Sequence, residues 1–317
     1  MKRSLAAVAT AATLLLAIPS PASAVPETQL HLAALERGPD VRVPHLEGHT
    51  VVDGDTRIPV RAGRVRLLGT SGEEYVVGTS NSSGAGSFRV LRLAADGARR
   101  VVLRDVPVWD MRLSGDGTQL GSARQDRDTR IRVWDSRTGL VETRRLFRGS
   151  VTILDFDENR MVLGGWGPDR TFWWNTATDR TRRIASQPGY AAEISADRVA
   201  TLTADPYQGG CSVVSTLRGH DRVWRSCDER VWRFSPDHGR MATIPLLTDG
   251  VGPADVYVHG PGGRLTSHYT SRWFDTVTWE TDRALLLEAN GARHSATVRC
   301  VAQDCERASD LRPVPTL

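Results

Sequence analysis

Lysine is almost missing from this sequence, which contains it only at Lys2, so arginine supplies nearly all of the 41 basic residues. The arginines are scattered among 37 acidic residues and do not form the concentrated basic stripe that a nucleic-acid partner requires. The sequence therefore argues against nucleic-acid binding. The use of arginine in place of lysine is typical of a GC-rich genome, and we assign it no function.

Long apolar runs are also missing, with one exception near the N-terminus. Lys2 and Arg3 precede the apolar segment 5–18, and Ala22-Ser-Ala24 offers small residues for cleavage. This order is that of a secretory signal peptide over residues 1–24. A membrane anchor is the alternative, but the run is shorter than the ~20 apolar residues of a spanning helix. We expect a mature chain of net charge +2, without a membrane span, secreted into the medium or attached to the cell wall.

The local motifs of common enzymes are absent as well. The sequence has no Gly-x-Ser-x-Gly nucleophile elbow and no His-Glu-x-x-His pair, and its eight histidines are dispersed. Asp53-Gly-Asp55 could begin a calcium loop, but the later ligands are not at the required spacing. We therefore predict no catalytic residue, no metal and no cofactor, which leaves open only activity built from scattered residues.

The four cysteines are few but regularly placed. Cys211 and Cys227 each lie eight residues from Gly219, so a hairpin turning there brings them opposite each other. Cys300 and Cys305 bracket four residues at the mouth of another hairpin. This spacing predicts two local disulfides, which suits an oxidising compartment. A metal site using the second pair is the alternative, but no His-Cys cluster stands nearby.

A repeat of about 42 residues organises the rest of the chain. The unit at residues 108–147 contains four short segments with strand character, separated by turn sequences such as Ser114-Gly-Asp-Gly117. Comparable turns recur at intervals of 38 to 45 residues, opening at Gly69, Ser114, Asp157, Ser195, Ser235 and Glu280. Four strands in each unit of this length are typical of the blades of a β-propeller.

The unit at residues 108–147 also resembles a known repeat. Leu113-Ser-Gly-Asp-Gly-Thr-Gln-Leu120, followed by Arg132-Val-Trp-Asp135, looks like a WD40 repeat, and Ser235-Pro-Asp-His-Gly239 is similar to repeats of secreted bacterial propellers. The resemblance covers about residues 65–312. It implies a ring that closes by pairing an N-terminal strand with the C-terminal blade, which removes free sheet edges.

The predicted fold is therefore all-β, a single propeller of four-stranded blades at residues 25–317 that follows the signal peptide. Six units are recognisable over residues 63–312. The mature length divided by the period gives about seven blades, so residues 25–62 are predicted to form a degenerate blade or closing strands. Six blades with an N-terminal extension are the alternative count.

The resemblance also indicates where a ligand would bind. Propeller ligands usually meet the loops that join strands two to three and four to one. In those loops Trp166 and Tyr207 are the best candidates, because large aromatic side chains on Gly- and Pro-rich loops are often contact residues. Arg124, Arg127 and Asp169 could add charged contacts. The alternative is a solvated rim with an incidental aromatic residue.

Two functions remain open for the sequence. We favour a secreted, non-catalytic and monomeric module that binds an extracellular protein, peptide or glycan, and the alternative is a small hydrolase or lyase with acids gathered in the central channel. Three or more ionisable groups with shifted pKa values at the channel mouth would favour the enzyme. An aromatic, shallow and charge-balanced face would favour the binding module.

Overall fold

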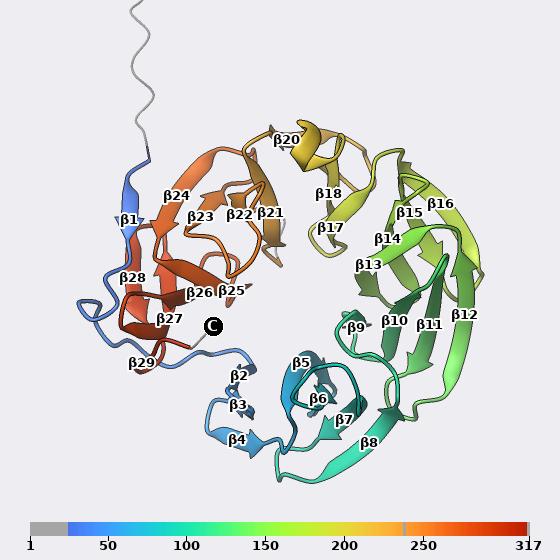
Figure 1. Ribbon diagram of the computed structural model, residues 1–317, viewed down its shortest axis with the longest axis horizontal. Coiled ribbons are helices and arrows are strands. Elements are labelled where there is room, and N and C mark those ends of the chain that lie inside the picture. Colours follow the sequence, from blue (N-terminus) through green and yellow to red (C-terminus); the bar gives the residue numbers. More distant parts are fainter. Residues whose placement is uncertain (1–24, 237–238, 316–317) are drawn as a thin grey trace, which may run out of the picture.

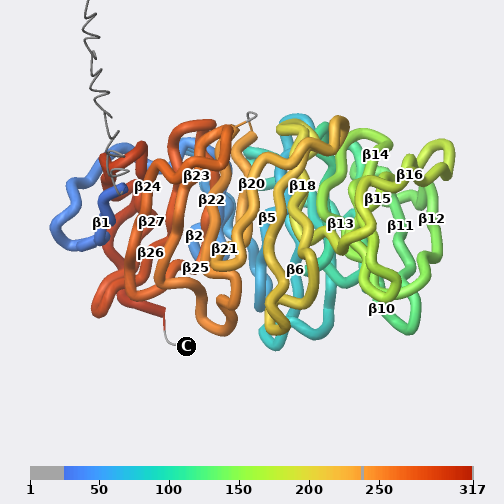
Figure 2. Tube along the Cα trace, turned by 90° about the horizontal axis from the view of Figure 1, so that it is seen from above, coloured from blue at the N-terminus to red at the C-terminus, as the bar shows by residue number. Residues whose placement is uncertain are grey.

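A ring of seven β-sheets makes up the structure (Figure 1). The computed structural model describes residues 25–236 and 239–315, and the ring that they form is a flat disc when seen from its edge (Figure 2). The prediction of an all-β propeller with seven blades is confirmed, and the six-bladed count is wrong. The predicted signal peptide, residues 1–24, lies outside the described residues.

Blades 2 to 5 are antiparallel sheets of four strands, which run from the inside of the ring to its rim. Blade 2 contains β5 (Arg64–Ser71), β6 (Glu74–Ser80), β7 (Arg89–Leu93) and β8 (Arg99–Arg104). Blade 3 contains β9 (Met111–Leu113), β10 (Gln119–Gln125), β11 (Thr129–Asp135) and β12 (Val141–Phe147). Blade 4 contains β13 (Ser150–Asp157), β14 (Arg160–Trp166), β15 (Arg170–Asn175) and β16 (Arg180–Ala185), and blade 5 contains β17 (Gly189–Glu193), β18 (Arg198–Leu202), β19 (Ser212–Thr216) and β20 (Arg222–Ser226).

Blades 6 and 7 each have one additional strand. Blade 6 contains β21 (Glu229–Phe234), β22 (Met241–Pro245), β23 (Asp255–His259) and β24 (Leu265–Thr270), and it gains β1 (Glu27–Gln29) at its outer edge. Blade 7 contains β25 (Trp273–Trp279), β26 (Leu285–Asn290), β27 (His294–Val301) and β28 (Asp304–Arg307), with β29 (Arg312–Pro313) beside β27. Blades 2 to 7 therefore correspond to the six repeats read from the sequence.

Blade 1 has only three strands, β2 (His45–Glu47), β3 (Thr50–Asp53) and β4 (Thr56–Pro59). Its apolar side chains, among them Val51 and Ile58, pack against Val77 of blade 2. The hydroxyl of Tyr75 in blade 2 donates a hydrogen bond of 2.8 Å to Asp53. This three-stranded sheet therefore shares its core with blade 2.

The core lies between the blades, because each sheet buries both of its faces against its neighbours. β6 is buried along nearly its whole length, whereas the outermost strand β16 is mostly exposed. Trp174 is completely buried between blades 3 and 4 together with Phe156 and Met161. This stacking explains why an interior strand such as β6 is buried while an outermost strand such as β16 is exposed.

The turn that first revealed the repeat forms as the sequence predicts. The amide of Gly117 donates to the carbonyl of Ser114 at 2.8 Å, and Asp116 accepts from the Ser114 hydroxyl at 2.6 Å. Gly117 has a φ of +72°, and a β-carbon there would lie 2.5 Å from the carbonyl oxygen of Thr70. Glycine is therefore required both by the backbone conformation and by the close approach of blade 2.

The ring closes differently from the expectation. β1 runs parallel to β24 of blade 6, so the N-terminal strand covers the sixth blade and not the last one. The chain then crosses the outside of blade 7, where Arg37 forms a single parallel bridge with Arg307. Within the described residues, no strand of blade 1 pairs with a strand of blade 7. The expected closure by a shared final sheet is wrong for this chain.

A buried arginine holds this crossing segment in place. Arg299 on β27 donates hydrogen bonds to both carboxylate oxygens of Glu280, at 2.6 and 2.8 Å, and to the backbone carbonyls of Pro39 and Asp40. The amide of Arg42 donates to the same Glu280 at 2.8 Å. We call this group the closure clamp, because it joins the last blade to the segment that leads into the first.

Electrostatics favour the charged form of the clamp. Burial alone would raise the pKa of Glu280, but the hydrogen bonds from Arg299 and Arg42 lower it below its ordinary value. Because the folded pKa of this carboxyl lies below the unfolded one, the clamp stabilises the fold at neutral pH. Its contribution is lost as the pH falls below the ordinary carboxylate range.

Replacement of the clamp arginine tests this closure. Arg299→Ala leaves Glu280 buried without its partner, so we expect the free energy of unfolding at pH 7 to fall by about 3–5 kcal/mol. Chemical denaturation followed by tryptophan fluorescence measures the loss. Arg293→Ala, which removes an exposed arginine of the same blade, is the control and should change stability by less than about 0.5 kcal/mol. Equal stability of the two variants would contradict the role of the clamp.

Candidate functional site

One face of the ring carries the loops in which binding residues were predicted. The β10–β11 loop contacts the β12–β13 connection, since Asp128 accepts a hydrogen bond of 2.9 Å from the amide of Gly149. In the same way the indole of Trp109, between β8 and β9, donates to the carbonyl of Gly84, between β6 and β7, at 2.8 Å. Loops joining strands two to three and four to one therefore share one side of the disc, which we call the loop face.

The five predicted residues all lie at this face, on three consecutive blades. In blade 3, Arg124 lies near the end of β10 and Arg127 in the β10–β11 connection. In blade 4, Trp166 is the last residue of β14 and Asp169 lies in the β14–β15 connection. Tyr207 lies in blade 5 on η1 (Pro206–Gln208), a single helical turn. Arg124 and Asp126 form a loose pair at 3.9 Å on exposed side chains, which contributes little to stability.

The two aromatic side chains are accessible to a partner. Trp166 is 38% exposed and Tyr207 is 71% exposed. The Tyr207 hydroxyl approaches Asp249 of blade 6 at 3.5 Å, so its ring leans toward the next blade. Among the described residues, no hydrogen bond or ring contact joins Trp166 with Tyr207, so the structure places them on neighbouring blades without bringing them together.

Sequence reasoning missed two further exposed residues of the loop face. Leu247 and Val251 lie in the β22–β23 loop of blade 6 and are 51% and 46% exposed. They lie beside Gly250, Gly252 and Pro253. A search for any large apolar residue on a Gly- and Pro-rich loop, not only for aromatic ones, would therefore have identified them. We name Trp166, Tyr207, Leu247 and Val251 the loop-face patch. It extends over blades 4, 5 and 6.

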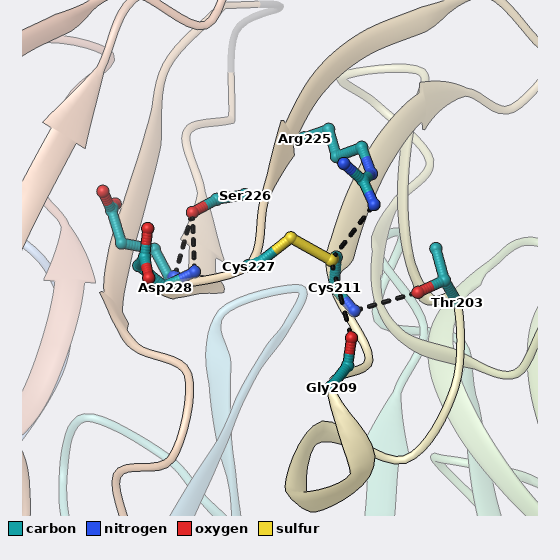
Figure 3. The surroundings of a disulfide bond; sticks show 8 residues. Thr203, Gly209, Cys211, Arg225, Ser226, Cys227 and Asp228 are labelled. Carbon is teal, nitrogen blue, oxygen red and sulfur yellow. Dashed lines mark hydrogen bonds between the residues drawn. A yellow bond between two sulfur atoms is a disulfide. The ribbon is translucent and has the colours of Figure 1, made fainter.

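A disulfide supports the loop that carries Tyr207 (Figure 3). Cys211, directly before β19, is bonded to Cys227, directly after β20, with an S–S distance of 2.07 Å. The amide of Cys211 donates to the hydroxyl of Thr203 at the other end of the same loop, at 2.9 Å. Cys300 and Cys305 are bonded at the β27–β28 hairpin. Both pairings agree with the hairpin spacing of the sequence. The first disulfide holds the end of the Tyr207 loop at Cys211, and the hydrogen bond to Thr203 ties the other end of the loop to it.

A second group of polar residues lines the channel. Arg112, Asp155 and Arg233 occupy equivalent positions on the innermost strands of blades 3, 4 and 6, where they pair with Gly121, Val162 and Ala242. Glu193 is the last residue of β17 in blade 5. The charge of Arg112 contributes to lowering the pKa of Arg233 although their blades are not adjacent, so this interaction crosses the channel. These four residues, the channel cluster, lie toward the end opposite the loop face.

The carboxyl groups of the channel cluster are shifted toward their neutral forms. Burial raises the pKa of Asp155, although it accepts a hydrogen bond of 2.6 Å from the amide of Ile194. Burial, and then the nearby charge of Asp155, raise the pKa of Glu193 to about 7. Burial also lowers the pKa of Arg233, with a further contribution from Arg112. A carboxyl group that titrates near pH 7 is suited to proton transfer.

Both carboxylates nevertheless form hydrogen bonds that hold the structure of neighbouring blades together. Asp155 links blade 4 to blade 5 through the Ile194 amide. Glu193 accepts from the hydroxyl of Ser195 at 2.6 Å, and the same hydroxyl reaches the carbonyl of Pro236 in blade 6 at 3.2 Å. The raised pKa of Glu193 is therefore explained by packing at the contact of blades 4, 5 and 6, and catalysis is not needed to account for it.

Over residues 25–236 and 239–315, no three His, Cys, Asp or Glu side chains gather closely enough to hold a metal ion. In the same part of the chain, no helix has the length and apolar character needed to cross a bilayer.

The known proteins that match this chain are similar to it in structure and not in sequence. No family model and no curated protein matches the chain. The propeller domain of the Trilobed protease from Pyrococcus furiosus, described as having an open velcro topology, matches with a TM-score of 0.61 and 10% identity over 82% of this chain and 86% of that one. The Cps50 (Swd1) propeller domain from Myceliophteria thermophila gives 0.56 and 10%, over 81% and 89%.

The chain has a WD40-like β-propeller fold. Peptidases are among the proteins that share it. Acylaminoacyl peptidase from Pyrococcus horikoshii matches with a TM-score of 0.61 and 9% identity, but the match covers 82% of this chain and only 47% of the peptidase. At such identities the likeness shows the fold alone, so the activity of this propeller must be argued from its own residues.

The disulfide of blade 5 provides one test of the site. Cys211→Ala with Cys227→Ala opens a loop of 16 residues, and we expect the free energy of unfolding to fall by about 3 kcal/mol in urea denaturation. Cys300→Ala with Cys305→Ala opens a loop of only 5 residues, and it should cost less, about 2 kcal/mol. A larger loss for the shorter loop would contradict the loop-entropy explanation.

The channel provides a second test through pH. Glu193 has a raised pKa in the folded propeller, so its stabilising effect is complete below pH 4.5 and is lost as the pH rises to about 7. The loss amounts to at most about 3 kcal/mol. Glu193→Gln should reduce this loss and make the protein more stable than wild type at pH 8, as measured by denaturation at pH 4.5 and pH 8.

The control for this pH test is Glu158→Gln, which alters an exposed acid of the adjacent turn. It should follow the wild-type dependence on pH. If Glu193→Gln also follows it, Glu193 is not the buried titrating group.

Proposed function

We propose that this propeller is an exported, non-catalytic module, and that an extracellular protein, peptide or glycan docks on its loop face. The observation that supports the proposal best is the loop-face patch. It places four large apolar side chains, all at least 38% exposed, on the loops of three consecutive blades. Exposed apolar side chains that occur singly are normal, so the proposal rests on their position on adjacent blades, where one macromolecular partner can contact several of them at once.

The surroundings of the patch favour binding over chemistry. Tyr207 and Trp166 are residue types that dominate binding energy at interfaces, because they bury a large area and lose little side-chain entropy. The loop of Tyr207 is fixed at both ends by the Cys211 disulfide and the Thr203 hydrogen bond, so little ordering remains to be done when a partner binds. The four charged residues of the channel cluster lie toward the opposite end of the channel.

Two features support the export of the protein. Both pairs of cysteines are joined as disulfides, which persist in oxidising compartments. The sequence of residues 1–24 has the order of a secretory signal peptide. We propose that the propeller acts as a monomer, since the ring already closes on itself through its N-terminal segment.

Substitution of the aromatic residues tests the binding proposal. Trp166→Ala with Tyr207→Ala should weaken binding of the extracellular partner at least 30-fold, since each aromatic contact of this kind contributes about 1–2 kcal/mol or more. Quantitative affinity capture from the extracellular fraction of the producing organism identifies proteins and glycans retained by wild type. Their affinity for purified variants is then measured by surface plasmon resonance.

The matched control removes exposed apolar residues from the other face. Leu140 lies in the turn between strands three and four of blade 3, and Val301 ends the third strand of blade 7 at the same kind of turn; they are 69% and 44% exposed. Leu140→Ala with Val301→Ala should leave binding unchanged. If this variant weakens binding as much as the aromatic one, or if the aromatic one binds like wild type, the loop face is not the docking surface.

Catalysis in the channel is the second candidate, and the pKa of Glu193 favours it. If the propeller is a hydrolase or lyase, Glu193→Gln should abolish turnover of a glycoside or ester substrate while the protein remains folded. The Trp166 and Tyr207 variant would then lose substrate affinity at most. Turnover by wild type that disappears in Glu193→Gln would replace the binding proposal with an enzyme.

A further inference from the structure

The outer rim of the propeller is unevenly covered. β1 lies along β24 of blade 6, and the segment around Arg37 lies along blade 7, whereas β8, β12, β16 and β20 leave the edges of blades 2 to 5 open. The open strands are rich in arginine, with the sequences RRVVLR, VETRRLF, RTRRIA and RVWRS. The covered strand β24, LTSHYT, has none. Charged side chains on free edges prevent pairing with other chains, so protection explains this distribution.

The protection of free sheet edges does not explain the arginines of one pocket in this rim. A cavity of about 400 Å³ lies between the outer halves of blades 3 and 4. Its lining includes Phe147, Phe172 and four arginines, Arg145, Arg148, Arg170 and Arg183, and it contains no acidic residue. Arg148 lies in the β12–β13 connection and Arg170 on the interior strand β15, so neither of them guards an edge. We call this cavity the arginine pocket.

Aromatic rings fix two of the guanidinium groups. Arg145 lies over the ring of Phe147 at 5.2 Å, and Arg170 lies over the ring of Phe172 at 4.8 Å. The two phenylalanines are buried and contact each other at 5.5 Å. Stacking on a buried ring restricts a flexible side chain, so these two arginines are held in place before any ligand arrives.

Most of the positive charge in the arginine pocket is not neutralised. Arg145 is paired with Asp179 at 2.8 Å. Arg170 donates to the carbonyl of Arg148 at 3.1 Å, but its Nε is buried and has no hydrogen-bond partner. Among the described residues, the guanidinium groups of Arg148 and Arg183 form no ion pair. Three unneutralised guanidinium groups on three different elements, one with an orphan donor, form a site prepared for an anion.

We propose that the arginine pocket binds a tetrahedral oxyanion ester, a phosphate or sulfate group carried on an extracellular polymer. A group with three or more acceptor oxygens can receive hydrogen bonds from Arg148, Arg170 and Arg183 together, whereas a carboxylate offers only two oxygens. The pocket is also large enough to take the sugar or polyol unit that bears the anion. This inference rests on the proposed export but is argued from the lining of the pocket alone. Trp166 of the loop-face patch lies across the β14–β15 connection from Arg170 and does not line the pocket.

Defined ligands test the proposal by isothermal titration calorimetry in 150 mM NaCl. The probes are inorganic phosphate and sulfate, an oligomer of glycerol phosphate, a sulfated tetrasaccharide, and an oligogalacturonate as a carboxylate polymer of similar charge. We expect the phosphate or the sulfate oligomer to bind at least 10-fold more tightly than oligogalacturonate, and the better of the two identifies the source of the anion. Equal or tighter binding of oligogalacturonate, or no binding of any probe to folded protein, overturns the proposal.

Matched double variants separate a defined site from diffuse attraction. Arg148→Ala with Arg183→Ala should weaken binding of the preferred oligomer at least 30-fold. Arg144→Ala with Arg182→Ala removes the same charge from β12 and β16, but from residues that do not line the pocket, and it should change affinity less than 2-fold. Equal losses in both variants would show that the rim attracts polyanions without a site.

Two further controls complete the test. Thermal unfolding confirms that each variant is folded. Trp166→Ala with Tyr207→Ala should bind the oligomer like wild type, so the outcome here is independent of the outcome for the loop face. Loss of oligomer binding in this variant would overturn the placement of the site in the arginine pocket.

Discussion

Within the described residues the first and last blades share no sheet, so the segment between β1 and blade 1 joins them, through the polar contacts of the closure clamp and the burial of Leu30, Leu32 and Val41. Propellers remove their free edges by closure, and closure through a shared sheet would supply a full ladder of backbone hydrogen bonds. Here the N-terminal segment passes outside blades 6 and 7, and the closure clamp ties it to Glu280 and Arg299 before it enters blade 1. The three-stranded blade 1 depends on this clamp on one side and on the core of blade 2 on the other.

The arrangement of the blades around the ring gives the protein three separate surfaces, two faces and a rim. Strand order places the loops of the patch on one face and the hairpin turns, with the channel cluster nearby, toward the other. The rim is a third surface, where blades 2 to 5 are open and carry arginine. The pKa of Glu193 is raised where three blades meet, so a shifted carboxyl in a channel is also a consequence of packing. For this reason the accessible aromatic residues of the loop face weigh more in the functional argument than the shifted acids.

Much of the architecture could be predicted from the sequence, because it depends on local chemistry. Turns such as Ser114–Gly117 and the spacing of cysteines around Gly219 act within one hairpin, and the repeat length gave the number of blades. The loop location of Trp166 and Tyr207 followed from the same strand order. Contacts between distant segments could not be predicted. β1 contains three residues, and each of them pairs with a residue 241 positions later in the chain. The Arg299 clamp, the channel cluster and the arginine pocket each combine several segments or blades. The exposed Leu247 and Val251 were missed because only aromatic residues were considered.

Hydrogen exchange of the intact protein, followed by mass spectrometry, tests the closure most directly. If the N-terminal segment closes the ring, the amides of residues 27–38 and of blade 1 should be protected to an extent similar to the outer strands of blades 6 and 7, and they should exchange together with them as denaturant is added. Complete exchange of residues 27–38 within seconds in native buffer, while blades 2 to 7 stay protected, would contradict this account and show a ring that is open at its first blade.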